Sequence, residues 1–154
     1  MKSTTPELAA LPERAPMPRF TGIVIAFWAG SLWSICTLLA PTLFMLLEDR
    51  AVAGRLAARF FDLATLIGLI AAVILLALSL GRHVMPGRFT RTLVLLTAGL
   101  PLLSKLALGP LMDQARAAGN MARFGALHGV AAGLFFLACA SALGMVWNFS
   151  QRDK

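Results

Sequence analysis

The chain has 154 residues, of which 58% are hydrophobic and 14% charged, with a net charge of +7 and a mean hydropathy of +0.79. Soluble domains hold about 45–50% apolar and about 25% charged residues, so this composition excludes an ordinary water-soluble domain. The Lys and Arg residues fall mostly in short gaps between apolar runs, without a basic helix or an aromatic-interleaved basic patch. Nucleic-acid binding is therefore not expected, and the lipid bilayer is the expected partner.

Four apolar runs follow a polar, proline-containing segment at residues 1–19, which we expect to be disordered in the cytoplasm. A helix of about 20 apolar residues crosses a bilayer. The first run is too long for the core of a signal peptide, so it is expected to remain as a span. The sequence predicts an all-α, integral membrane four-helix bundle over 20–149, followed by a cytoplasmic tail at 150–154. The predicted spans are 20–47, 57–81, 92–112 and 124–149.

The distribution of basic residues predicts the orientation of the spans. The side that holds both termini and the second loop carries more Lys and Arg than the side with the first and third loops. The positive-inside rule then puts both termini in the cytoplasm. The absence of Tyr and the heavy use of Ala, Leu, Arg and Gly indicate a bacterial inner (plasma) membrane protein.

Small residues at helical spacing predict where helices pack, because membrane helices associate through small and polar residues. Such a face admits another backbone or a flat cofactor. Pro101 should kink the third span near Thr97, either opening a cavity or improving packing. The predicted packing residues are Gly125, Gly129 and Gly133 in the fourth span, Gly30 and Ser34 in the first, and Pro101 in the third.

Three ionisable residues lie within or at the edge of spans, namely Asp62, Lys105 and His128. Counted from the loop boundaries, each lies roughly 6–8 Å inside the same non-cytoplasmic boundary. Charged groups in membrane helices usually face inward and pair, so we expect Asp62 near Lys105 or Arg59, with His128 close by. Three alternatives stay open: a local Arg59–Asp62 pair, a Lys105 side chain that snorkels to the surface, and a His128 imidazole bonded to a backbone carbonyl.

The sequence offers little for ordinary catalysis. Cys36 and Cys139 are not spaced as a metal motif, and the depths counted for them differ, so we expect no disulfide between them. There is no His-, Cys- or Glu-x-x-His metal spacing, no phosphate-binding loop and no assignable Ser/His/Asp triad. We assign no catalytic or metal-binding residue and expect a protein that is not an enzyme.

Several segments resemble the transmembrane protein 205-like family, known in bacteria as a domain of unknown function. The resemblance runs from Phe27 to Trp147 and implies a four-span helical membrane protein without an established reaction. A second likeness is to membrane bundles of the copper-resistance D and haem-biosynthesis oxidase type, which also use intramembrane His. The segments that carry the first resemblance are FWAGSLWSICTLLAPTLF, AGRLAARFF, the Gly109-Pro110 step before DQARAAG, and RFGALHG.

These observations support three hypotheses of function. In the first, a polar pocket formed by Asp62, Lys105 and His128 binds or passes a small solute or an assembly partner, which is a second copy or another membrane protein. In the second, His128 binds haem or a metal in a redox protein, with Lys105 as the second axial ligand if it is neutral. In the third, the protein is a structural accessory subunit whose polar groups serve packing alone.

Overall fold

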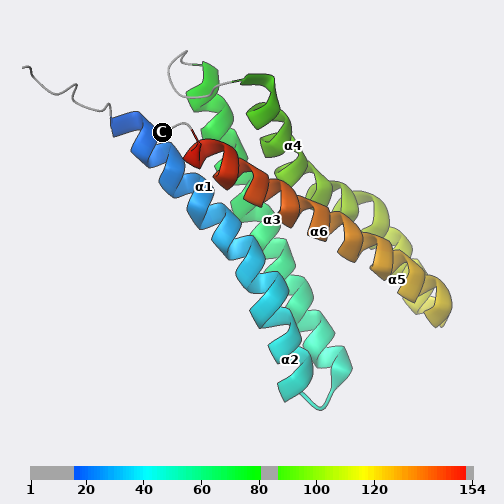
Figure 1. Ribbon diagram of the computed structural model, residues 1–154. Coiled ribbons are helices and arrows are strands. Elements are labelled where there is room, and N and C mark those ends of the chain that lie inside the picture. The colour runs from blue at the N-terminus through cyan, green and yellow to red at the C-terminus, as the bar shows by residue number, and fades with distance from the viewer. Residues whose placement is uncertain (1–15, 81–86, 152–154) are drawn as a thin grey trace, which may run out of the picture.

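The chain folds into two long helical hairpins, shown in Figure 1. This computed structural model describes residues 16–80 and 87–151. The first hairpin contains α1 (Pro16–Ser34), the π-helical segment η1 (Ile35–Leu39), α2 (Ala40–Leu46) and α3 (Arg50–Leu80). The second contains α4 (Gly87–Leu103), the π-helical segment η2 (Ser104–Leu108), α5 (Gly109–Ala117) and α6 (Met121–Ser150).

The four helical stretches are long and apolar enough to cross a membrane, so the protein is a multi-pass membrane protein. Each has 28 or 30 residues, well beyond the ~20 that a bilayer requires. Hydrophobic side chains dominate even their exposed faces, as expected where the surrounding medium is lipid. The stretches run over Arg19–Leu46, Arg50–Ser79, Arg88–Ala117 and Met121–Ser150.

Side-chain caps explain where the second helix of each hairpin begins. Asp49 Oδ1 accepts hydrogen bonds from the backbone N–H groups of Ala51, at 2.7 Å, and Val52, at 3.2 Å, in the first turn of α3. Asn120 Oδ1 accepts from the Arg123 N–H at 3.0 Å at the start of α6. Such caps satisfy N–H groups that have no partner within the helix.

The beginning of α1 differs from the sequence prediction. The disordered segment was predicted to run to residue 19, but α1 begins at Pro16. Proline is well tolerated in the first turn of a helix, where its missing N–H would have no intrahelical partner, so the helix extends back through Pro18. Residues 1–15 and 152–154, which belong to the predicted N-terminal segment and tail, lie outside the described part of the chain.

The two π-helical segments share one cause, a proline two residues beyond each of them. The Ala40 N–H bonds to the Ile35 carbonyl, and the Gly109 N–H bonds to the Ser104 carbonyl. The next residues, Pro41 and Pro110, have no N–H to donate, and a proline ring clashes with the carbonyl four residues earlier. A wider turn just before each proline relieves that clash, and such π turns are frequent at functional sites.

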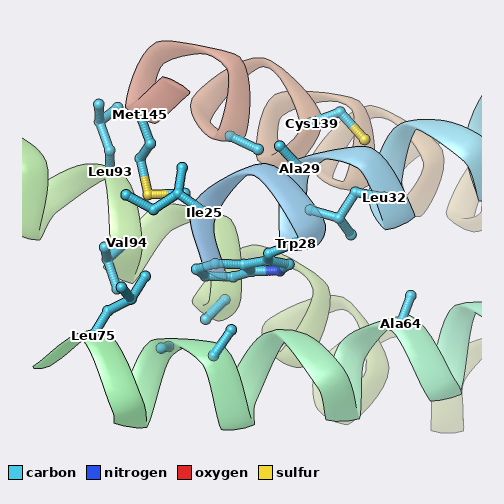
Figure 2. Packing of buried hydrophobic residues seen from close by; sticks show 14 of the residues in the cluster. Ile25, Trp28, Ala29, Leu32, Ala64, Leu75, Leu93, Val94, Cys139 and Met145 are labelled. Atoms are coloured by element: carbon cyan, nitrogen blue, oxygen red, sulfur yellow. The ribbon is translucent and has the colours of Figure 1, made fainter. Parts of the chain in front are cut away.

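The hydrophobic core occupies the half of the molecule that contains the two described chain ends. Figure 2 shows Trp28 lying flat between α1 and α3, with Ile25, Leu75, Val94 and Met145 around it. The side chains of Trp28, Leu75, Val94 and Met145 have no exposed surface. In water, full burial of a large apolar side chain stabilises a fold by about 1.5–3 kcal/mol. In lipid, the same close packing stabilises the fold through dispersion contacts.

The other half, which we call the open end, is built differently. It comprises α2, the first turns of α3, α5 and residues 121–134 of α6. Within α6 the buried residues begin only at Phe135, and α2 has none. Here α2 packs on α3 and α5 packs on α6, while the hairpin tips diverge, as Figure 1 shows. The predicted bundle is therefore closely packed over one half only.

Candidate functional site

An ion pair joins the two hairpins where the packed half meets the open end. The Lys105 Nζ atom in η2 lies 2.8 Å from the Asp62 Oδ1 atom in α3. The side chain of Lys105 is 51% exposed and that of Asp62 is 45% exposed. These exposures show that the two groups are not enclosed in the core. Both lie well within the apolar spans, away from the ends of their helices. Of the two partners predicted for Asp62, the structure selects Lys105.

An aromatic contact beside the ion pair fixes the level at which the hairpins meet. The rings of Phe61 and Phe135 pack edge to face, with centroids 4.6 Å apart. Phe61 precedes Asp62 in α3, and Phe135 is the first buried residue of α6. The ion pair therefore lies just at the border of the core. Sequence reasoning missed both phenylalanines, although their helical spacing from Ala64 and Ala138 was a usable signal.

His128 is farther from this border than the sequence predicts. In the second hairpin Thr90 contacts Asn148, Gly144 faces Leu93, and Arg116 lies over Phe124. This antiparallel register puts Lys105 opposite the stretch just before Phe135, so His128 lies one to two helical turns closer to the hairpin tip, a rise of about 5–10 Å. The predicted third span ends at residue 112, whereas the helix continues through α5 to Ala117. The boundary from which depth was counted therefore lies farther toward the hairpin tip than the prediction placed it.

The surroundings of His128 are aromatic and exposed. Its ring stacks on Phe124, with centroids 5.9 Å apart and planes 13° apart. The Arg116 guanidinium lies 4.6 Å from the centroid of the same Phe124 ring. At helical spacing, His128 shares the face of α6 that carries Phe124 and Phe135, so it extends the core-side face into the open end. A guanidinium on an aromatic face contributes about 0.5–1 kcal/mol at an exposed site.

Arg59 does not join the pair. It is exposed in α3, and among the residues that the structure describes the only salt bridge is the one between Lys105 and Asp62. The structure therefore brings together two of the four residues of the predicted polar pocket. His128 and Arg59 belong to the open end without a described polar contact to either.

The small residues that the sequence predicts at helix contacts face away from the core. Gly30, Gly125, Gly129 and Gly133 are exposed, and a Cβ atom added at any of them would have no described side chain or neighbouring helix within 4 Å. Ser34 is exposed as well. Within the described chain these residues do not bring two helices into contact, and on α6 the core side is formed by Phe135, Ala138 and Ala142, on the face opposite its glycines.

Pro101 is buried, as expected of a packing residue. The backbone stays α-helical through Thr97 and Pro101, and the first departure from α-helical geometry is η2 at Ser104. The sequence prediction put the irregularity at Thr97. The proline that determines it is Pro110, which acts on the preceding turn.

The two cysteines correct a further prediction. The sequence places them at different depths, yet Cys36 packs against the core cluster that contains Cys139. Trp33 Nε1 donates to the Cys139 carbonyl oxygen at 3.1 Å, which fixes the crossing of α1 over α6. Both cysteines are free thiols. The antiparallel register of α1 and α6, in which Gly22 faces Phe149 and Trp33 bonds to Cys139, brings the two cysteines to neighbouring levels.

The arrangement bears on the haem and metal hypothesis. The Lys105 amine is engaged by Asp62, and an ammonium group in an ion pair has no lone pair for a metal. That leaves His128 as the single candidate ligand from the predicted pair. Over the described ranges, no cluster of three His, Cys, Asp or Glu side chains could hold a metal ion.

Comparison with protein families identifies the family of this chain. Residues 23–121 match the model of a family described as a domain of unknown function, DUF4149. The matched region covers most of the first span and all of the second and third, and it ends at the start of α6, so it includes Asp62, Lys105 and both π-helical segments. No curated protein and no solved structure matches the chain.

Proposed function

The chain belongs to the DUF4149 family, and we propose that it is an assembly protein of the bacterial inner membrane whose open end receives a membrane-spanning segment of another protein. The excess of basic residues at the ends and in the second loop orients both termini toward the cytoplasm. The open end then lies on the non-cytoplasmic side. The resemblance to the transmembrane protein 205-like family is part of this proposal.

The observation that carries the proposal is the half-exposed ion pair. Lys105 and Asp62 are each about half exposed although they lie within apolar spans. Exposure of two charges to acyl chains is costly. A protein segment that covers the pair and donates or accepts a hydrogen bond would remove that cost.

The open end also favours a protein segment over a solute that passes through the molecule. The hairpin tips diverge, and the core-side face of α6 continues through Phe124, which is half-buried under Arg116, and through His128, which is exposed. This leaves an aromatic and imidazole-bearing face open from the side, at the level where a partner helix would lie. A small solute would require an enclosed path, whereas a helix requires a face of this kind.

Photo-crosslinking from opposite faces of α6 tests the proposal. The photoreactive residue p-benzoylphenylalanine is placed at Phe124, on the core-side face, or at Ala126, at nearly the same depth on the opposite face. In native membranes, illumination should give a discrete protein adduct from position 124 and lipid adducts alone from position 126. The adduct at 124 should disappear in the double variant Asp62→Asn/Lys105→Met, provided that this variant is folded.

Two results would count against an assembly role. One is lipid adducts alone at both positions. The other is a protein adduct that survives loss of the ion pair, because the covering segment would then not depend on it.

The haem hypothesis has a direct test of its own. Purified protein with haem bound through His128 should show a Soret band that is absent in His128→Ala. Absence of the band from protein isolated in mild detergent, after growth with added haem precursor, would exclude this role.

A further inference from the structure

A groove lies between α4 and α6 at the end of the molecule opposite the hairpin tips. It is open to the side and has a volume of about 550 Å³. Gly144, which has no side chain, helps to hollow it where α6 passes Leu93. Its other lining residues include Phe89 from α4 and Leu143, Trp147, Asn148 and Ser150 from α6.

The position of the groove along the helices corresponds to the interface between the lipid headgroups and the acyl chains. Phe89 and Trp147 belong to the terminal turns of their spans, and their side chains are 64% and 69% exposed. Aromatic rings at such positions mark the headgroup level of a membrane. Deeper along the groove the lining is aliphatic, with Leu143 exposed beside Gly144, so the groove offers an apolar wall below an interfacial rim.

The rim also carries polar groups. Asn148 Nδ2 donates to Thr90 Oγ1 at 2.7 Å, which ties α6 to the first turn of α4. The Ser150 hydroxyl donates to the Trp147 carbonyl oxygen at 2.9 Å. The first bond holds the ends of α4 and α6 together beside the groove, and the second fixes the Ser150 hydroxyl against its own helix.

The distribution of charged residues along the molecule favours binding of an anion at the end that carries the groove. Arg88 and Arg91 are exposed in the first turns of α4, the helix that contributes Phe89, although neither side chain lines the groove. The acidic residues within the described ranges, in contrast, all lie away from the groove, in the hairpin tips or at the border of the open end: Glu48, Asp49, Asp62 and Asp113. An apolar wall therefore lies at the same end of the molecule as two exposed guanidinium groups, with no nearby described carboxylate.

We propose that this groove is a binding site for an anionic phospholipid. One acyl chain lies along Leu143, Gly144 and Trp147, and the phosphate lies near Arg88 and Arg91 at the N-terminal end of α4. Basic pockets between membrane helices recognise anionic lipid headgroups in this way. The first turn of a helix adds a favourable electrostatic contribution for an anion.

Quenching of Trp147 by brominated lipids tests the proposal. The protein and its Trp147→Phe variant are reconstituted in vesicles, so that the difference between them reports on Trp147 alone. In one series brominated phosphatidylglycerol is diluted into phosphatidylcholine, and in the other brominated phosphatidylcholine is diluted into phosphatidylglycerol. At equal mole fraction, the brominated phosphatidylglycerol should quench Trp147 more strongly, corresponding to a several-fold preference.

Arginine variants identify the source of that preference. Each basic residue near a membrane surface accounts for up to roughly fivefold in anionic-lipid affinity. Arg88→Gln/Arg91→Gln should abolish the preference, Arg88→Lys/Arg91→Lys should keep most of it, and Arg50→Gln/Arg55→Gln, which removes equal charge at the other end, should leave it unchanged.

Equal quenching by the two lipids in the unmodified protein would overturn the proposal. So would a preference that Arg88→Gln/Arg91→Gln leaves intact. Weak quenching by both lipids would show that protein, such as a second copy of the chain, covers the groove instead, which also overturns it.

Discussion

At the scale of single residues, the energetics of the protein depend on a few polar groups inside apolar surroundings. Lys105 and Asp62 satisfy each other at 2.8 Å. Trp28 is different: its Nε1 atom is buried without a hydrogen-bond partner in the described part of the chain. A missing hydrogen bond of this kind costs about 1–3 kcal/mol. Close packing of the large indole against its neighbours offsets that cost.

The ion pair should behave as a coupled unit. Asp62→Asn and Lys105→Met should each lower the free energy of unfolding by about 1–3 kcal/mol, because each leaves the other charge without its partner among apolar spans. The double variant should lose less than the sum of the two. The measurement is the unfolding free energy from denaturing-detergent titration in mixed micelles. Strictly additive losses would show that the two side chains do not interact.

The contact between Trp28 and Gly68 gives a second prediction. A Cβ atom on Gly68 would lie 2.8 Å from Trp28 Nε1, too close for a ring that is fully buried. Gly68→Ala should therefore destabilise the protein by about 1–3 kcal/mol, as overpacking of a core does. Its matched control is Gly54→Ala, also in α3, where nothing lies within 4 Å of the added atom.

The control change should be neutral or slightly stabilising, because alanine favours a helix by about 1 kcal/mol over glycine. Adding Trp28→Phe to Gly68→Ala should recover part of the loss, since the smaller ring leaves room for the methyl group. Equal stability of the two alanine variants would contradict the packing described for α3.

At the scale of the elements, each hairpin begins with a span of the same design. In both, a five-residue π segment starts six positions before a proline, at Ile35 before Pro41 and at Ser104 before Pro110. A π turn contains about one residue more than the α-helical turn that it replaces. The extra residue alters the local face of the helix, and in the second hairpin the altered turn is the one that carries Lys105.

Deletion of single residues tests this description of η2. Removing Ala107 takes one residue from the π segment and preserves the faces of α4 and α5, but it leaves Pro110 in an α-helical turn at a cost of about 3 kcal/mol. Combining the deletion with Pro110→Ala should restore most of that loss. Removing Leu96 from the regular part of α4 should prevent folding, because it rotates the face of one flank by about 100° relative to the other.

The readout is the folded fraction in detergent, from gel filtration and unfolding titration. The Ala107 deletion combined with Pro110→Ala should be far less damaging than the Leu96 deletion. Equal damage would show that η2 does not contain an extra residue relative to an α-helical turn.

At the scale of the whole molecule, hydropathy and charge were enough to predict four spans, and depth counting was enough to bring Asp62 to the level of Lys105. The register and facing of the helices were not predictable in this way. The register of the second hairpin separates His128 from the ion pair, and the choice of packed face on α6 leaves Gly125, Gly129 and Gly133 outward. Both depend on which side chains interdigitate across two surfaces, and a hydrophobic pattern along a single helix does not contain that information.

The divergence of the hairpin tips gives a prediction for the molecule in a bilayer. Spin labels at Glu48 and Ala118, in the two tips, should be separated more widely than labels at Phe20 and Ser150, near the described chain ends. At those ends a Cβ atom on Gly22 would lie 2.8 Å from the Phe149 ring, so the helices there are in close contact. Cys36 and Cys139 would be replaced by alanine, so that only the two chosen sites carry labels. The distance between the labels would be measured by pulsed electron–electron double resonance.

The same measurement separates an open end that belongs to the isolated chain from one that closes in lipid. Similar separations for the two label pairs would mean that the hairpins pack along their whole length, which would cover the core-side face of α6 and remove the surface on which the assembly role depends. If a partner segment lies between the hairpins, the tips should be far apart in pure lipid, and the distribution of tip distances should be narrower in native membranes. A bound helix restricts the relative motion of the hairpins.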